Sequence, residues 1–254
     1  MADVLGGIIE AFELIVSGNP EIYGIVSRSL LFSGTAVILA ILWGTPLAML
    51  IALKEFRGKS IIKTFFNSLM GIPTVVLGLI LFLIFSRGGP AGFLGIIYTP
   101  AVIIIGQAIL VTPISISIGV SAIEAVDPEI MNLSKTLGAS ESQAQIAVLK
   151  EAISGVILSD VASFNRAIAE LGVVLLVGGG IGGGGNRTDV LTTAISRYIQ
   201  MNELGFAVAL GIFLVAIIFA VNMIVFMARK APATVEFVRR SYPKIKRLIR
   251  ERRR

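Results

Sequence analysis

The chain is 254 residues long; 55% of the residues are hydrophobic, only 15% are charged, and the mean hydropathy is +0.89. Ordinary soluble domains contain about 25% charged residues, so a water-soluble globule of this composition would expose large apolar patches and aggregate. The sequence has no cysteine and no histidine, which excludes disulfides, Cys/His zinc sites and His-based catalytic triads. We therefore expect an all-α integral membrane protein: a transporter subunit, a channel or a scaffold.

The N-terminal segment, residues 1–20, has apolar residues at helical spacing and is expected to form a short helix. These residues are Leu5, Ile8, Ile9, Phe12, Ile15 and Val16. Asp3, Glu10 and Glu13 stand where a signal peptide would carry positive charge, so a signal peptide is not expected. The pattern favours a helix that lies in the interface on the outer side of the membrane, with a sixth, weakly apolar transmembrane span as the alternative.

Long uncharged stretches cover residues 29–53, 64–86, 88–123 and 204–228. Each meets the ~20 apolar residues that a helix needs to cross a bilayer. Together with a less apolar segment they predict five spans, at about residues 23–53, 61–85, 98–123, 152–177 and 204–228; a sixth span at the N-terminus is the alternative. Pro46, Pro73 and Pro113 lie inside the first three predicted spans, either as gate hinges or as determinants of helix shape.

The distribution of basic residues predicts the topology. Residues 229–254 contain eleven Lys and Arg against two Glu, and such clusters flank spans on the cytoplasmic side. Counting back through five spans places the basic loop 54–59 inside and the N-terminus outside. We expect a multi-pass plasma-membrane protein with a transmembrane domain over 21–230 and a basic cytoplasmic tail over 231–254. The tail either binds anionic lipid or is a solvated anchor; nucleic-acid binding is not expected, because only the tail is basic.

Two short motifs match nucleotide-binding patterns without their context. The segment Arg57-Gly58-Lys59-Ser60 lacks the first P-loop glycine and a preceding strand. The glycine run that starts at Gly178 satisfies G-x-G-x-x-G, but it follows a membrane helix rather than a strand. If transport is driven by ATP, another chain must therefore hydrolyse it. The glycine run is interpreted as a docking hinge or as a loop leading into a re-entrant-looking segment, 189–200.

The polar segment between the third and fourth predicted spans, residues 124–151, should be cytoplasmic and should contain a short helix. Asp127 is a suitable N-cap and Pro128 suits the first turn. Gly138 can adopt the left-handed conformation that ends a helix. Without further information this is a surface helix that joins two spans.

The fourth predicted span carries a polar stripe. Ser159, Ser163, Arg166 and Glu170 follow at spacings of four, three and four, which predicts one shared helix face, and Asp160 lies one position round. An unpaired charge at mid-membrane costs at least ~2.5–3.5 kcal/mol, so the stripe should face the bundle interior or a water-filled cavity. Arg166 and Glu170 can pair one turn apart. The pair either fixes the packing of spans or lines a translocation path near the outer gate, where an anionic solute would favour an exposed Arg166.

Several segments resemble one family. Thr136-Leu137-Gly138-Ala139-Ser140 resembles the EAA-type coupling loop of ABC importer membrane subunits, although Asn132-Leu133-Ser134 replaces Glu-Ala-Ala and Lys150-Glu151 replaces the later Leu-Pro. The segment 164–172 looks like the Arg-x-x-x-Glu-x-Gly stretch of the molybdate/tungstate/sulfate permease group. Val177-Gly178-Gly179, followed by the segment 191–195, is similar to tungstate-type permeases in particular. The four glycines at 182–185 depart from that pattern, and the resemblance covers about residues 5–230.

This resemblance implies a type I ABC importer-like fold and a homodimer with the path on its two-fold axis. Two ATPase subunits would dock on the coupling helix, formed by Asn132, Leu133, Ser134, Lys135, Thr136, Leu137, Gly138, Ala139 and Ser140. An extracytoplasmic oxyanion-binding protein would deliver a tetrahedral oxyanion, with tungstate expected first and molybdate next. The chain itself would be no enzyme, with no catalytic residue, metal or cofactor, since ATP and Mg²⁺ bind the partner ATPase.

Two other classes of function remain as alternatives. A stand-alone secondary carrier or channel would use Asp160, Arg166 and Glu170 as a proton or ion site, and an inverted internal repeat, which we do not find, would favour it. An intramembrane enzyme would need Asp or Ser chemistry. Asp160, however, has no second intramembrane Asp in this sequence.

Overall fold

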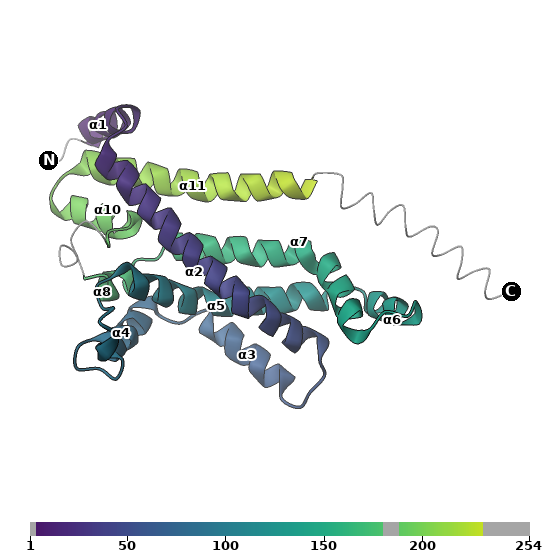
Figure 1. Cartoon of the computed structure of the whole chain (residues 1–254). Coiled ribbons are helices and arrows are strands. Elements are labelled where there is room, and N and C mark those ends of the chain that lie inside the picture. The colour runs from purple at the N-terminus through teal and green to yellow at the C-terminus, as the bar shows by residue number, and fades with distance from the viewer. Residues whose placement is uncertain (1–3, 180–187, 231–254) are drawn as a thin grey trace. The chain divides into compact units, whose positions relative to one another are not determined.

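The computed structural model describes residues 4–179 and 188–230, and all regular elements in these ranges are helices (Figure 1). They are α1 Val4–Val16, α2 Pro20–Leu53, α3 Lys59–Leu69, α4 Thr74–Phe85, the 3₁₀ turn η1 Gly92–Leu94, α5 Pro100–Glu124, α6 Pro128–Thr136, α7 Glu141–Ile168, α8 Gly172–Val177, α10 Leu191–Gln200 and α11 Leu204–Lys230. The expected basic tail and most of the glycine run lie outside the described residues. The chain divides into two units, Met1–Ile218 and Phe219–Arg254.

The all-α expectation is confirmed for the described ranges. Within them, α2, α5 and the Leu204–Ala228 part of α11 are long and apolar enough to cross a membrane. The bent pair α3 and α4 adds a fourth span if the two helices count as one. The predicted fourth span is not in this set, because the helix that carries it is comparatively polar, so the count of five spans remains a prediction.

The second predicted span, residues 61–85, does not form one continuous helix. The chain instead forms α3 and α4, whose axes differ by 95° across a short break. Pro73 is the N-cap residue of α4 and does not lie inside a helix. Proline disfavours helical backbone in the residue before it, which favours a helix break at this position. Pro46 and Pro113 do lie inside helices, in α2 and α5.

The centre of the bundle is α5, which packs against both α2 and α7 (Figure 1). Small residues permit this close approach, as is usual between membrane helices. A Cβ atom placed on Gly44 of α2 would lie 3.1 Å from the Ser115 hydroxyl of α5. A Cβ atom on Gly155 of α7 would lie 2.6 Å from the Ala122 Cβ atom. Glycine is therefore required at the α5–α7 contact.

The fourth predicted span, residues 152–177, is also corrected. α7 starts at Glu141, where the Ser140 side chain and Gln143 form a capping box, and it ends at Ile168. The chain leaves the helix there and forms the short α8. A Cβ atom on Gly172 would lie 2.5 Å from the Thr74 hydroxyl oxygen, so α8 begins where α4 leaves no room for a side chain.

Candidate functional site

The predicted capped helix in the polar segment is confirmed as α6. The Asp127 carboxylate accepts a hydrogen bond of 2.9 Å from the Glu129 backbone N–H, and Pro128 occupies the first turn. Gly138 ends the helix with φ of +89°, in the left-handed region that glycine tolerates best. Lys135 lies 2.6 Å from Glu141 at the start of α7, and this ammonium holds the pKa of the Glu141 carboxyl below its ordinary value.

One side of α6 is attached to the bundle and the other is open. Ile130 and Met131 pack on the cluster that contains Ile123 and Val148, whereas no residue of α6 is fully buried. Leu137, just after the helix, is 75% exposed. α6 is therefore a short element that is attached to α5 and α7 on one side and exposed on the other.

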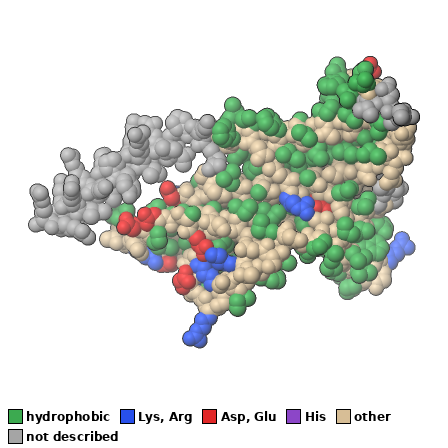
Figure 2. Space-filling view, turned by 180° about the vertical axis from the view of Figure 1, so that it is seen from behind, with side chains coloured by type: hydrophobic (Ala, Val, Ile, Leu, Met, Phe, Trp, Pro, Cys, Tyr) green, Lys and Arg blue, Asp and Glu red, His purple; other side chains and the backbone are tan. Residues whose placement is uncertain are grey.

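Charged side chains gather over the region of α3 and α6, while broad apolar patches cover much of the remaining surface in the view of Figure 2. Lys63 of α3 lies 2.6 Å from Glu124 at the end of α5, and Lys59 lies 3.3 Å from the same carboxylate. Lys59 also pairs with Glu55 at 2.9 Å. This cluster ties the start of α3 to the end of α5, three residues before the α6 cap.

The structure brings together the predicted Arg166–Glu170 pair. The Arg166 Nη1 atom lies 2.5 Å from Glu170 Oε2, so the predicted pairing is confirmed. The Glu170 side chain is 2% exposed, whereas that of Arg166 is 34% exposed. Glu170 does not lie on the same helix as the rest of the stripe, because α7 ends two residues earlier.

Glu170 occupies the junction of three helices. Its other carboxylate oxygen accepts a hydrogen bond of 3.0 Å from the Val173 N–H in the first turn of α8, where a negative charge is favourable. Its backbone carbonyl accepts one of 2.6 Å from the Thr192 hydroxyl of α10. A single buried carboxylate residue therefore fixes the end of α7 relative to α8 and α10.

The two serines of the stripe are buried in the helix packing. Ser159 and Ser163 are 1% and 0% exposed, and the Ser159 hydroxyl lies 3.5 Å from the Ser115 carbonyl of α5. The buried Gln107 amide of α5 donates to the Ala167 carbonyl at 3.1 Å, close to the end of α7. Of the four stripe residues, Arg166 alone reaches the surface of the single chain.

Sequence reasoning missed an ionic network between α2 and the segment that leads into α10. Arg197 lies 3.1 Å from Asp189 and 3.4 Å from Glu21, and the Tyr198 hydroxyl donates to Glu21 at 2.5 Å. The Arg28 Nε–H donates to the Asp189 carbonyl at 3.2 Å. The contacts that Glu21 and Arg28 of α2 make in this network join residues more than 160 positions apart in sequence, so no local spacing pattern indicates them.

The comparisons with known proteins agree with this architecture. The family model described as "Binding-protein-dependent transport system inner membrane component" matches residues 44–231. The tungstate uptake system permease protein TupB of Peptoclostridium acidaminophilum is 36% identical over 89% of this chain and 98% of its own length. A probable anion ABC transporter permease protein of Haloferax volcanii is 34% identical over 78% of this chain and 86% of its own length.

A solved structure shows the same fold. The MetNI methionine ABC transporter, in an inward-facing conformation, aligns with a TM-score of 0.66 at 16% identity, over 84% of this chain and 98% of that one. The family model covers well over half of the sequence, and the TupB relative aligns along nearly all of it. This chain therefore belongs to the family of membrane subunits of binding-protein-dependent ABC transporters, and it is not itself the catalytic subunit.

Proposed function

We propose that this chain is the permease of an ATP-driven importer of a tetrahedral oxyanion, with tungstate as the leading candidate substrate and molybdate as the next. The observation that carries the proposal is the 36% identity to the TupB tungstate permease over nearly the full length of both proteins. Family membership implies an ATP-hydrolysing partner and a solute-binding protein. It also sets aside the stand-alone carrier and the intramembrane enzyme, since an ABC membrane subunit works with a separate ATPase.

The ATPase docks on the coupling helix, residues Asn132 to Ser140, in this proposal. The exposed face of α6 and the following turn support it, as does the attachment of α6 to both α5 and α7. Closure of the two ATPase subunits would move α6 as a rigid body. Because α7 runs from this end of the bundle to the Arg166–Glu170 junction, the movement reaches the predicted outer gate along one continuous helix.

Ser159, Ser163, Arg166 and Glu170 are the candidates for the translocation path and gate. The exposure of the Arg166 side chain supports a role in contacting the anion, whereas the burial of Glu170 supports a role in holding the gate in place. The proposal further includes a homodimer of type I architecture, with the path on its axis. It places the N-terminus and the binding protein outside and the C-terminus in the cytoplasm, as the positive-inside rule predicts.

Co-purification tests this proposal. The tagged chain is isolated in mild detergent from its native cells, every retained protein is identified, and the metal content of the retained binding protein is measured. We expect an ATPase and a binding protein that holds tungstate or molybdate. We also expect loss of the ATPase for Gly138→Asp, which places a side chain at positive φ and a charge on the docking face, but not for Gly211→Ala, where open space surrounds the glycine. A chain that purifies alone from cells with active uptake contradicts the proposal.

A further inference from the structure

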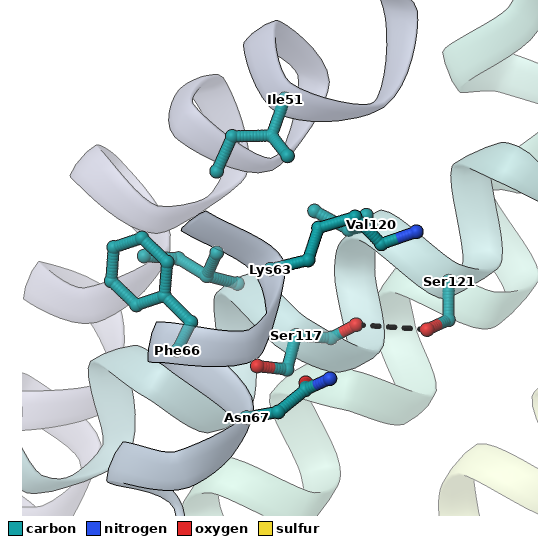
Figure 3. A pocket seen from close by; sticks show the side chains of 8 residues that line it. Ile51, Lys63, Phe66, Asn67, Ser117, Val120 and Ser121 are labelled. Carbon is teal, nitrogen blue, oxygen red and sulfur yellow. Dashed lines mark hydrogen bonds between the residues drawn. The ribbon is translucent and has the colours of Figure 1, made fainter. Parts of the chain in front are cut away.

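A small hollow lies between α2, α3 and α5, toward the α6 end of the bundle (Figure 3). Its volume is about 20 Å³, which is enough space for one water molecule. Ile51 and Phe66 form apolar walls, while Lys63 and Asn67 of α3 face Ser117 and Ser121 of α5 across it. The hollow therefore combines apolar walls with convergent polar groups, as small-ligand sites do.

Ser117 supplies a polar atom that the protein leaves unused. The residue is 8% exposed, and its hydroxyl makes no hydrogen bond within the described part of the chain. Ser121 does not satisfy it, because the Ser121 hydroxyl donates to the Ser117 backbone carbonyl at 3.0 Å. A buried hydroxyl without a partner costs free energy, so the Ser117 hydroxyl is available to donate to an acceptor in the hollow, either a water molecule or a ligand atom.

Among the described residues that line the hollow, Lys63 carries a positive charge and none carries a carboxylate, which favours an anion as that ligand. Lys63 and Asn67 are one turn apart on the same face of α3. The Lys63 ammonium lies 2.6 Å from Glu124, but Lys59 uses the same carboxylate at 3.3 Å, and the other partner of Lys59, Glu55, is 88% exposed. Lys59 therefore has two carboxylate partners, and Lys63 shares one of them, Glu124. The Lys63 side chain is 35% exposed and can turn to a second anionic group.

We propose that this hollow is a binding site that the translocated oxyanion occupies on its way through the transporter, and we call it the anion station. One anion oxygen enters the hollow and accepts the Ser117 O–H, while the outer oxygens accept from the Lys63 ammonium and the Asn67 amide. A cation with neutral donors is the arrangement that compensates the desolvation of an anion in a protein. The neighbouring Glu124 carboxylate weakens the attraction, as suits a site that the solute must leave. This inference rests on the proposed function, because it takes its ligand from there.

The absence of cysteine from the sequence permits a direct test, since Ser117→Cys introduces the only thiol of this chain. The complete transporter carrying this variant is treated in detergent with a maleimide, with and without ATP, in sodium tungstate or in sodium chloride of equal ionic strength. At ten times the half-protecting tungstate concentration we expect labelling to slow about tenfold. Ser68→Cys is the control, because Ser68 is exposed on α3 and does not line the hollow.

Each outcome decides the inference. Protection of Ser117→Cys but not Ser68→Cys, abolished when Lys63→Met is added, supports an anion station. Equal labelling in tungstate and chloride, equal slowing at both positions, or no labelling in any condition contradicts it and indicates a site for water alone. If Ser117→Cys does not assemble, Asn67→Cys tests the same hollow. Tungstate uptake by the unmodified transporter is measured in parallel, so that failure of the station is distinguished from failure of the proposed function.

Discussion

Replacing Glu170 with Gln should destabilise the protein strongly although the change is nearly isosteric. The carboxylate is 2% exposed, pairs with Arg166 and accepts from the Val173 N–H. Breaking a buried ion pair costs about 3–5 kcal/mol. In the variant the amide oxygen keeps the Val173 hydrogen bond, and water reaches the Arg166 side chain, which is 34% exposed. We therefore expect the free energy of unfolding to fall by about 3 kcal/mol, the lower end of this range. For a chain of this size the melting temperature in detergent should fall by roughly 6–12 °C.

The matched control for this experiment is Glu55→Gln. Glu55 also forms an i,i+4 pair, with Lys59, but its side chain is 88% exposed. Exposed pairs contribute little, so the melting temperature should change by no more than about 2 °C. In addition, the double variant Arg166→Gln/Glu170→Gln should lose less stability than the sum of the two single variants, because the residues interact directly. Equal effects of Glu170→Gln and Glu55→Gln would refute the role of the buried pair.

Two further substitutions test local features of the fold. Asp127→Ala removes the α6 cap and should cost about 1 kcal/mol of helix stability. Amide hydrogen exchange in α6 should therefore become about fivefold faster. Asp127→Asn, which can still cap the helix, should change the exchange rate little. Gly155→Ala places a Cβ atom 2.6 Å from the Ala122 Cβ atom, and such overpacking costs about 1–3 kcal/mol. Its melting temperature should fall, while that of Gly211→Ala, which meets open space, should not; the opposite order would show that α5 and α7 do not pack as described.

Short-range chemistry was predictable from the sequence. The Asp127 cap, Pro128 in the first turn and the left-handed Gly138 define α6 through residues that are neighbours in the chain. The Arg166–Glu170 pair is similarly local, since the two residues are four positions apart in the sequence. These features depend on backbone and side-chain preferences that act over a few residues, so the local pattern was sufficient.

Other features depend on packing between distant segments. The prediction placed Pro73 inside the second span, as a gate hinge or as a determinant of helix shape, but Pro73 begins a separate helix at a 95° break. The end of α7 before Glu170 follows from its contacts with α8 and α10, and hydropathy does not show it. The sequence alone likewise does not show that the Ser117 hydroxyl is unpaired, because this depends on how α3 packs against α5. Hydropathy reports how apolar a segment is, but not where a neighbour interrupts it.

The most direct test of the account is ATP-driven uptake by the reconstituted system. The chain, its ATPase and its binding protein are placed in proteoliposomes, and internal tungstate, molybdate and sulfate are measured. We predict that tungstate accumulates only when ATP and all three proteins are present, and that molybdate is the stronger competitor of the other two anions. Uptake by the chain alone without ATP would contradict the account, as would a complete system that hydrolyses ATP without accumulating any of these oxyanions.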